Sequence, residues 1–239
     1  MTKKILITGA NGQLGHEMRN ALKGNNRFEC IFTDVAELDI CNAEAVKQII
    51  ADNHIDYIVN CAAYTQVDKA EDNAELCKKI NTDAVENLAR AAADYGARMI
   101  HISTDYVFNG RGYSPYTEDM PPDPQSVYGS TKLEGEKILT DICPESIIIR
   151  TAWLYSPYGN NFVKTMLHLG EEREELSVVA DQIGTPTCAA DLAQAILVIL
   201  QADTFVPGTY HFSDEGVCSW YDFTVTIHRL AGITTCRVT

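Results

Sequence analysis

The feature that most constrains this chain is a glycine-rich turn that follows its first apolar segment. Residues 4 to 8 are mostly large and apolar, and Gly9, Gly12 and Gly15 follow before a helical pattern begins. This order predicts a strand, a tight turn and a helix whose N-terminal N–H groups can hold a pyrophosphate. Such a turn can also be only a tight strand-to-helix connection, so the rest of the chain has to decide.

A tyrosine and a lysine four positions apart form the second motif. Tyr128 and Lys132 would share one face of a helix, and we expect the ammonium to favour the phenolate and lower the pKa of Tyr128. The pair can equally mark a solvated helix face. A buried-looking strand, residues 100 to 108, delivers hydroxyls at its end, and ligands of open parallel sheets bind beyond such ends. Together the motifs point to a nicotinamide-dependent oxidoreductase.

Apolar strand patterns alternate with amphipathic helical patterns through the first 150 residues. The longest helical stretch is expected over residues 73 to 95, and shorter elements follow residue 150. The alternation predicts an α/β fold, a Rossmann-like doubly wound parallel sheet, with residues 1–150 as the dinucleotide-binding domain. The expected strands are residues 4–8, 28–33, 57–61, 99–103 and 146–150, and then the shorter 176–179 and 209–212, with helices at 191–201 and 220–231.

Charge and cysteine content narrow the class of partner and the compartment. A formal net charge of −14 argues against nucleic acid and anionic membrane surfaces as partners, because both need a basic footprint. Eight cysteines show no metal-ligand spacing, and reduced thiols in a cytoplasmic protein are expected. We expect neither a signal peptide nor a membrane anchor.

The chain resembles the extended short-chain dehydrogenase/reductases, and within them the dTDP-4-dehydrorhamnose reductase subgroup. The resemblance implies a smaller substrate-binding portion, residues 151–239, interleaved with the Rossmann core. Members usually run several dozen residues past Thr239, so we expect a truncated chain and an incomplete substrate site. The segments that carry the likeness are residues 12–15, 60–65, 67–71, 103–108, 128–136, 150–153 and 182–187.

The cofactor site can be assigned partly from spacing and partly from the resemblance. Asp34 lies about twenty residues after the turn, where an acidic group bonds the adenosine ribose, which favours NADH over NADPH on charge. The resemblance implies that both cofactors are accepted. It also places Asp39 and Ile40 beside the adenine, although Asp39 could instead be only a helix N-cap or a turn residue. The remaining expected cofactor residues are Gly9, Gly12, Gln13, Leu14, Gly15, Ala62, Ala63, Tyr64, Tyr128 and Lys132.

The resemblance implies hydride transfer to the C4 ketone of a dTDP-linked 4-keto-6-deoxy sugar. Tyr128 is the expected proton donor, Lys132 would bond the nicotinamide ribose, and Thr104 would hydrogen-bond the carbonyl oxygen. Thr104 is preferred to Ser103 because neighbouring strand residues face opposite ways. Tyr106 stands where the 4,6-dehydratases carry a glutamate, so dehydration is disfavoured.

The same resemblance supplies the substrate contacts. Trp153 could alternatively be a core residue without a ligand. A proline-rich stretch, residues 115 to 124, is expected to form a loop over the active site. Substrate contacts are expected at Thr65, Val67, Thr104, Asp105, Tyr106 and Trp153, with Asn161, Phe162, Gln182 and Thr187 as weaker candidates.

Metal, assembly and non-catalytic alternatives complete the expectations. The charged run at residues 171 to 175 is expected to be solvated surface, so no metal ligand is assigned, although the resemblance brings magnesium at a subunit contact into consideration. A homodimer is compatible with the family.

Two other functions stay open for a chain of this fold. One is that of a non-catalytic relative, such as the regulatory subunit of methionine adenosyltransferase, and the other is that of a nucleotide-sugar epimerase or another reductase.

Overall fold

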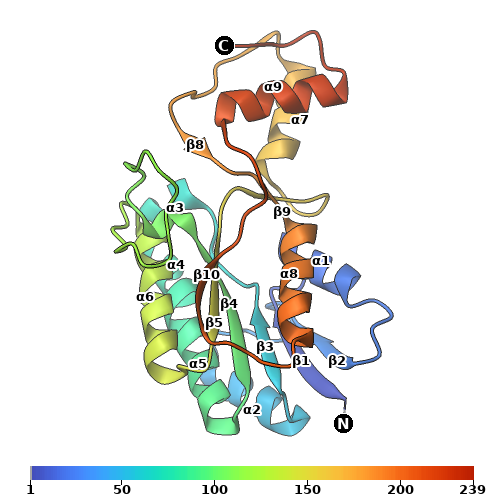
Figure 1. Cartoon of the computed structure of the whole chain (residues 1–239), viewed down its shortest axis with the longest axis vertical. Helices are drawn as coiled ribbons and strands as arrows, with labels where there is room; N and C mark the ends of the chain where they lie inside the picture. Colours follow the sequence, from blue (N-terminus) through green and yellow to red (C-terminus); the bar gives the residue numbers. More distant parts are fainter. Residues whose placement is uncertain (1) are drawn as a thin grey trace.

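A parallel sheet forms the centre of the computed structural model, which describes residues 2 to 239 (Figure 1). Within these residues the sheet has six strands in the order β10-β5-β4-β3-β1-β2, and every neighbouring pair is parallel. The strand order reverses beside β1, which opens a crevice at the carboxyl ends of β1 and β3. The strands are β1 (Lys3–Thr8), β2 (Phe28–Phe32), β3 (Tyr57–Asn60), β4 (Arg98–Thr104), β5 (Ile147–Thr151) and β10 (Gly208–His211).

Helices cover both faces of this sheet, as the alternating sequence pattern requires (Figure 1). Helices α1 (Gln13–Ala21) and α8 (Ala189–Gln201) pack together on one face. The opposite face carries α2 (Ala43–Asn53), α5 (Ala84–Tyr95) and α6 (Val127–Ile142). Short helical segments connect these layers: α3 (Val67–Asp72), α4 (Ala74–Lys78), the π-helical η1 (Lys79–Asp83) and the 3₁₀-helical η2 (Asp105–Val107).

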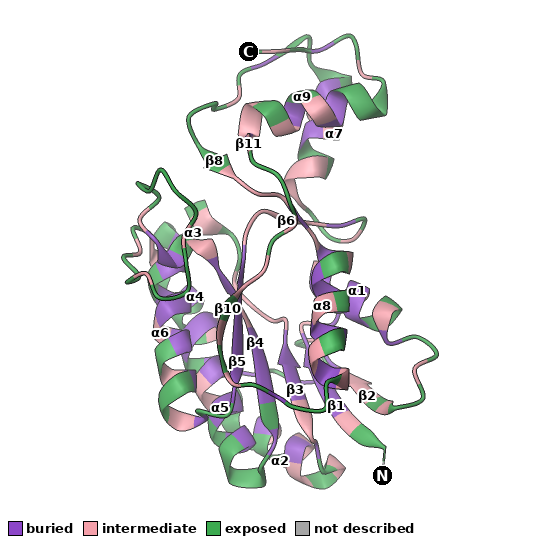
Figure 2. Ribbon diagram, in the orientation of Figure 1, coloured by how far each residue is buried: buried purple, intermediate pink, exposed green. Residues whose placement is uncertain are grey.

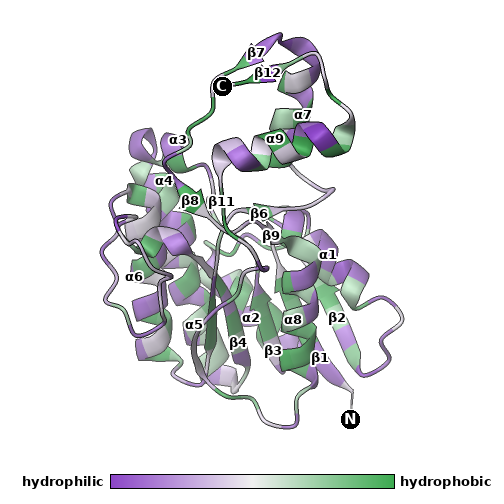
Figure 3. Cartoon of the chain, turned by 45° about the horizontal axis from the view of Figure 1, so that its top comes forward, coloured by the Kyte–Doolittle hydropathy of each residue, from purple (hydrophilic) through white to green (hydrophobic). Residues whose placement is uncertain are grey.

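Alternation along the strands gives the sheet two separate apolar layers. Leu6, Ile58 and Met99 point into the core beneath α2 and α5, whereas Ile5 and Ile100 point into the core beneath α1 and α8. Buried residues therefore follow the central strands and the inner helix faces (Figure 2), and these strands carry many apolar residues (Figure 3). Two packed layers hold the carboxyl ends of the strands in fixed positions.

The C-terminal part of the chain adds a smaller lobe above those carboxyl ends (Figure 1). Helices α7 (Phe162–Glu172) and α9 (Trp220–Ala231) pack against each other there. Residues after 150 also return to the core, since α8 packs on α1 and β10 pairs with β5. Short strand pairs complete this part: β6 (Leu154–Tyr155) with β9 (Thr187–Cys188), β7 (Glu175–Leu176) with β12 (Arg237–Val238), and β8 (Ile183–Gly184) with β11 (Cys218–Ser219).

The predicted fold class is confirmed, and three elements differ from expectation. The helical stretch expected over residues 73 to 95 is divided by the π-helical turn η1 between α4 and α5. The strand expected at residues 176 to 179 is only β7, since its partner β12 is itself two residues long. The strand expected at residues 209 to 212 forms as β10, one residue earlier, and lies at the edge of the main sheet.

Candidate active site

A cavity of about 870 Å³ lies where the carboxyl ends of the central strands meet the C-terminal lobe. Residues just after β1 and β3 border it on one side, and the ends of β4 and β5 form its floor. The other wall comes from residues 152 to 162 and from α9. This is the position in which open parallel sheets bind their ligands.

The glycine-rich turn brings the start of α1 to the edge of this cavity. Gly9 has a positive φ of 63°, and a Cβ there would lie 2.7 Å from the Cα of Ala62. A Cβ on Gly15 would lie 2.3 Å from the carbonyl oxygen of Gly9, so the helix can approach the strand only with glycine at this position. Gly12 is the N-cap of α1 and leaves its first N–H groups without a side-chain cap. Gly12, Gln13 and Leu14 border the cavity, and Gly9, Gly15 and Ala62 shape the turn behind them.

Asp34 follows β2 and is bonded to the glycine-rich turn. Its Oδ2 accepts a hydrogen bond from the backbone N–H of Asn11 at 2.9 Å, and its Oδ1 accepts one from Val35 N–H at 2.8 Å. The carboxylate thus holds the turn in place. Each oxygen still has a free lone pair for a ribose hydroxyl, so ribose recognition stays a prediction.

The residues expected beside the adenine have structural roles of their own. Asp39 is exposed, and its Oδ1 accepts from the N–H of Cys41 at 2.9 Å, which makes it a turn residue. Ile40 is buried in the core beneath α2. Asn42, and not Asp39, caps α2 by accepting from Ala45 N–H. Neither Asp39 nor Ile40 borders the cavity.

The segment after β3 reaches the cavity in an alternating way. Ala63, Thr65 and Val67 border it, whereas Tyr64 turns away and packs in a cluster with Tyr128. The Asn81 side chain holds this segment: it accepts from Tyr64 N–H at 2.8 Å and donates to the Tyr64 carbonyl at 3.1 Å. Asn81 lies in the π-helical turn, a feature that often marks functional sites.

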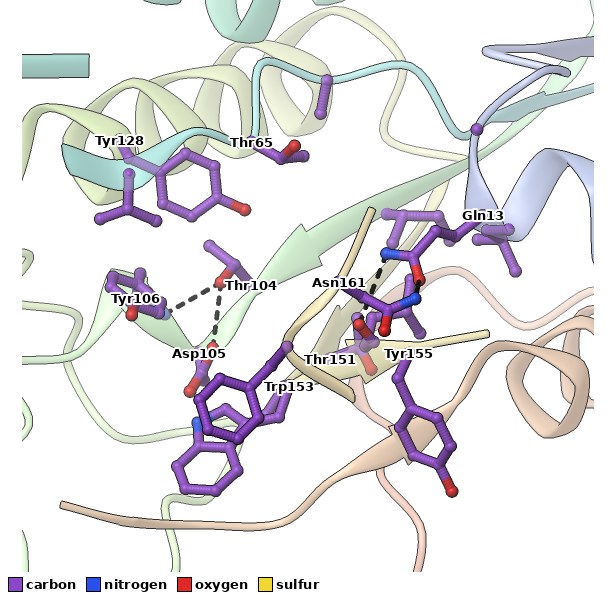
Figure 4. A pocket seen from close by; sticks show the side chains of 18 of the residues that line it. Gln13, Thr65, Thr104, Asp105, Tyr106, Tyr128, Thr151, Trp153, Tyr155 and Asn161 are labelled. Atoms are coloured by element: carbon purple, nitrogen blue, oxygen red, sulfur yellow. Dashed lines mark hydrogen bonds between the residues drawn. The ribbon is translucent and has the colours of Figure 1, made fainter. Parts of the chain in front are cut away.

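Thr104, Tyr128 and Lys132 come together at the floor of the cavity. Thr104 ends β4, and Tyr128 and Lys132 lie one helical turn apart on α6. Ser126 caps α6, accepting from Gly129 N–H at 3.0 Å. The Tyr128 hydroxyl points toward Thr104 (Figure 4). The sequence thus predicted these three residues as one group, and the structure places them together.

The electrostatic state of Tyr128 differs from the expectation. Burial raises the pKa of Tyr128 above its usual value, and an interaction with the Thr104 hydroxyl opposes this only in part. Lys132 points its Nζ to the carbonyl of Ile102 at 2.6 Å and to Nε2 of His101 at 3.3 Å. The prediction that Lys132 lowers the pKa of Tyr128 is therefore wrong for this structure.

Thr104 is the better placed of the two neighbouring hydroxyls. Its Oγ1 donates to Oδ1 of Asp105 at 3.0 Å and accepts from Tyr106 N–H at 3.2 Å. Ser103 also borders the cavity, but its hydroxyl is buried and has no hydrogen-bond partner among residues 2 to 239. Burial raises the pKa of Asp105 to about 6. Tyr106 borders the cavity and lies edge-on to Tyr128, with ring centroids 5.5 Å apart.

Trp153 belongs to an aromatic cluster that forms the wall opposite Thr104. It has a positive φ of 49°, and its ring stacks on Trp220 with centroids 3.4 Å apart. Phe162 and Phe223 extend this cluster, and all four rings border the cavity. A positive φ is rare for a bulky residue and persists only where its surroundings hold it. The stacking on α9 explains how Trp153 is held.

Of the four weaker substrate candidates, two border the cavity and two do not. Asn161 and Phe162 border the cavity, and Asn161 Nδ2 donates to Oε1 of Gln13 at 2.9 Å, which links the glycine turn to α7. Gln182 is exposed and Thr187 is buried in the short strand β9, and neither borders the cavity. The expectation of a direct contact at Gln182 and Thr187 is not met.

Several cavity residues were missed by sequence reasoning. Trp220 and Phe223 lie about sixty residues after the cavity-lining residues 152 to 162, and the sequence predicted only the helix that carries them. Four other missed residues lie in segments that carry the resemblance but received no role: Cys61, Lys69, Thr151 and Ala152. The rest lie outside those segments: Gln66, Ile102, Leu154, Tyr155, Gly159 and Asn160.

The proline-rich loop does not cover the site. Within the described chain, no residue from 109 to 127 borders the cavity. The loop is tied instead to the edge strand β10, where His211 N–H donates to Glu118 at 3.0 Å, and to the residue after η2, where Tyr116 stacks on Phe108. Figure 1 shows it beside α3 and α6. The expectation of a loop over the active site is wrong because these contacts hold it at the flank.

The charged run at residues 171 to 175 contributes to surface ion pairs. Glu175 pairs with Arg237, Glu172 lies 3.3 Å from the His168 ring, and all four side chains are at least half exposed. Between residues 2 and 239, no group of three or more metal-binding side chains was found. In the same range, no helix has the length and apolar character needed to cross a membrane.

Comparisons with known proteins identify the family of this chain. The family described as RmlD substrate binding domain matches residues 3–239. A dTDP-4-dehydrorhamnose reductase of Aggregatibacter actinomycetemcomitans is 44% identical over 94% of this chain and 78% of its own length. A solved reductase of that name from Clostridium acetobutylicum is 51% identical with a TM-score of 0.94, covering 99% of this chain and 82% of that one. A third, from Bacillus anthracis in complex with NADP, is 43% identical with a TM-score of 0.95, over 100% and 83%. The predicted resemblance is confirmed.

Proposed function

Because this chain belongs to the RmlD substrate binding domain family, we propose that it is an NAD(P)H-dependent dTDP-4-dehydrorhamnose reductase. It reduces the C4 ketone of dTDP-4-dehydro-6-deoxy-L-mannose and forms dTDP-L-rhamnose, a precursor of cell-surface polysaccharide. One observation carries the proposal from geometry: Thr104, Tyr128 and Lys132 meet in a single cavity that also receives the glycine-rich start of α1.

The residues present fit a nicotinamide dinucleotide. The uncapped N-terminus of α1 offers N–H groups and a positive dipole end to a pyrophosphate, and the glycines let the backbone approach it. Gln13 and Leu14 would border the cofactor on one side, and Ala63 and Thr65 on the other. When bound, the reduced nicotinamide supplies the hydride.

Tyr128 is suited to donate a proton to the sugar oxygen. Its phenol is protonated at neutral pH even at the ordinary pKa of 10.0, and burial raises that pKa, so the proton stays on the oxygen until alkoxide charge develops beside it. The Thr104 hydroxyl lies beside it, and its one hydrogen, which is donated to Asp105 in this structure, would turn to the carbonyl oxygen when substrate binds. Placing two donors at one oxygen stabilises the charge that forms in the transition state.

The aromatic wall would hold the nucleotide sugar against this floor. Trp153 and Trp220 present flat apolar surfaces, and Asp105 and Tyr106 supply polar groups opposite them. We place the sugar between these two sides. The names of the relatives, and not this geometry, specify the dTDP nucleotide.

Assembly and compartment are further parts of the proposal. We propose a homodimer, which sedimentation of the purified chain would test. All eight cysteines are free thiols within the described residues, which fits a reducing cytoplasm. The net charge of −14 makes nucleic acid an unfavourable partner.

A coupled assay tests the proposed function. The protein is incubated with dTDP-4-dehydro-6-deoxy-L-mannose and either NADH or NADPH, while nicotinamide absorbance is followed and the product identified. Cofactor oxidation matched by dTDP-L-rhamnose formation is expected. A non-catalytic regulatory relative would consume neither cofactor. An epimerase would regenerate its cofactor in each turnover, so no net consumption would be seen.

A further inference from the structure

Lys132 has surroundings that a lysine ammonium does not fit. Its side chain is 1% exposed, and its Nζ lies 2.6 Å from the carbonyl oxygen of Ile102 and 3.3 Å from Nε2 of His101. The carbonyl accepts a hydrogen bond from either form of lysine. The histidine nitrogen accepts one only if it carries no hydrogen, so the tautomer of His101 decides.

Asn60 fixes that tautomer. Its Oδ1 lies 2.7 Å from the Thr8 hydroxyl and 3.2 Å from the backbone N–H of Ala62. A backbone N–H can only donate, so the oxygen of the amide must face Ala62. The amide Nδ2 therefore faces Nδ1 of His101, at 3.0 Å, and donates to it. His101 consequently accepts at Nδ1 and carries its single hydrogen on Nε2.

Hydrogen counting then determines the form of Lys132. The Nε2–H of His101 points at Nζ, and an ammonium has no lone pair with which to accept it. A neutral amine has one lone pair and two hydrogens. It can accept from His101, donate to Ile102, and keep one N–H directed elsewhere.

We propose that His101 is a positioning residue that, in the Nε2–H tautomer set by Asn60, holds Lys132 as a neutral amine against the sheet. The proposal deepens the proposed function, because Lys132 lies in the site assigned there to the cofactor. To act as a cation toward a ribose or toward Tyr128, Lys132 must take up one proton from solvent and leave His101. Above pH 8, binding of the cofactor is then linked to uptake of that proton.

The titratable groups around Lys132 agree with this assignment. Burial lowers the pKa of Lys132 to about 8, although the charges of Glu136 on α6 and Cys77 on α4 oppose the shift. Glu136 is itself neutralised by Arg150 of β5, with an N–O distance of 2.7 Å. Burial holds the pKa of His101 well below its usual value, and Lys132 lowers it further whenever Lys132 is protonated. Above pH 8 the polar chain is therefore neutral from Asn60 to Lys132.

Nuclear magnetic resonance of the cofactor-free protein tests the proposal without any need for turnover. Nitrogen-15 shifts of His101 report which ring nitrogen carries the hydrogen, and the Cε shift of Lys132 reports its protonation. The Lys132 signal is identified by its absence in Lys132→Met. We expect hydrogen on Nε2 of His101 and a Lys132 midpoint near 8.

The Asn60→Asp variant inverts the arrangement with almost no change of shape. A carboxylate facing Nδ1 can only accept, so His101 moves its hydrogen to Nδ1 and presents a lone pair to Lys132. The Lys132 midpoint should then rise toward the ordinary lysine value of 10.5. His101→Gln, whose amide oxygen can accept from an ammonium, should raise it as well.

The control is His228→Gln, which removes a buried histidine in the C-terminal lobe, where Nε2 faces the carbonyl of Met166. It should leave the Lys132 midpoint unchanged. Hydrogen on Nδ1 of wild-type His101 would overturn the proposal, as would an unchanged midpoint in a folded Asn60→Asp or His101→Gln protein. If neither variant folds, the wild-type tautomer and midpoint decide alone. If the protein is not a reductase, the coupled assay shows no cofactor oxidation, while the His101 and Lys132 spectra stay as predicted here.

Discussion

At the residue scale, the proposed chemistry depends on one buried phenol. Tyr128 is buried between α4 and the end of β4, and its raised pKa keeps it protonated over the physiological range. The motif predicted that Tyr128 and Lys132 lie one helical turn apart, because residues four positions apart share one face of a helix. The motif could not predict the pKa of Tyr128, because the shift arises from burial and from the direction in which Lys132 points.

Replacing Tyr128 by phenylalanine should remove the acid and retain the ring. General acid catalysis contributes about 10²–10⁴-fold, so we expect kcat to fall by that order at saturating substrate. Steady-state kinetics measures the change, and unchanged circular dichroism and cofactor binding serve as controls. A variant with near wild-type kcat would remove Tyr128 from the proposed role.

Asp105 gives a pH dependence of stability with a defined sign. Its pKa is raised from 3.8 to about 6 by burial, so the folded protein holds a proton that the unfolded chain has lost between these values. Stability attributable to this group is present below pH 4 and is lost as the pH rises through 6. Asp105→Asn should therefore gain up to about 3 kcal/mol relative to wild type between pH 4 and pH 8.

Urea unfolding at a series of pH values measures this gain. The control is Asp52→Asn, which removes an exposed carboxylate from α2. Its stability difference from wild type should stay constant over the same range. A constant difference for Asp105→Asn would show that burial does not control this carboxyl group.

Asp34 has two roles that one substitution separates. Asp34→Ala removes the acceptor for Asn11 N–H and, in the proposed site, for the ribose hydroxyls. Ribose recognition predicts a loss for NADH of roughly 1.5–3 kcal/mol and a much smaller loss, or a gain, for NADPH, whose extra phosphate is no longer repelled. Fluorescence titration of wild-type and Asp34→Ala protein with each cofactor measures the two losses. Equal losses would mean that Asp34 only supports the turn.

At the element scale, α6 sets the distance between Tyr128 and the end of β4. A Cβ on Gly129 would lie 2.2 Å from the carbonyl oxygen of Tyr106, so only glycine allows this approach. The motif at Tyr128 and Lys132 placed a helix there without its bounds, and strand periodicity located all six main strands within one or two residues. Periodicity could not reveal the π-helical turn at η1 or the flank position of residues 115 to 124, because both depend on contacts between distant segments such as Asn81 with Tyr64 and Glu118 with His211.

Gly129→Ala should push α6 away from η2. Overpacking of this kind costs about 1–3 kcal/mol of stability, and the displacement of Tyr128 should lower kcat as well. Denaturant unfolding and steady-state kinetics measure the two effects. Ser130→Ala, at the next and exposed position of α6, should change neither, and a Gly129→Ala protein as stable and active as wild type would contradict the proposed spacing.

At the scale of the whole molecule, the site exists because two parts of the chain face each other. The Rossmann core supplies the glycine turn, Thr104 and Tyr128, and the C-terminal lobe supplies the aromatic wall around Trp153 and Trp220. Local motifs and the family resemblance identified most of the core side, although Cys61, Gln66 and Lys69 were missed. On the lobe side only Trp153, Asn161 and Phe162 were predicted, since the stacking of Trp153 on Trp220 joins segments far apart in the sequence and follows no local pattern.

The most direct test of the whole account follows the hydride itself. Wild-type protein is given dTDP-4-dehydro-6-deoxy-L-mannose with NADPH or NADH deuterated at the transferred position of the nicotinamide ring, and the sugar product is analysed by mass spectrometry and proton NMR. The account predicts dTDP-L-rhamnose that carries a single deuterium at C4. A product without deuterium at C4, or deuterium at any other carbon, would contradict it.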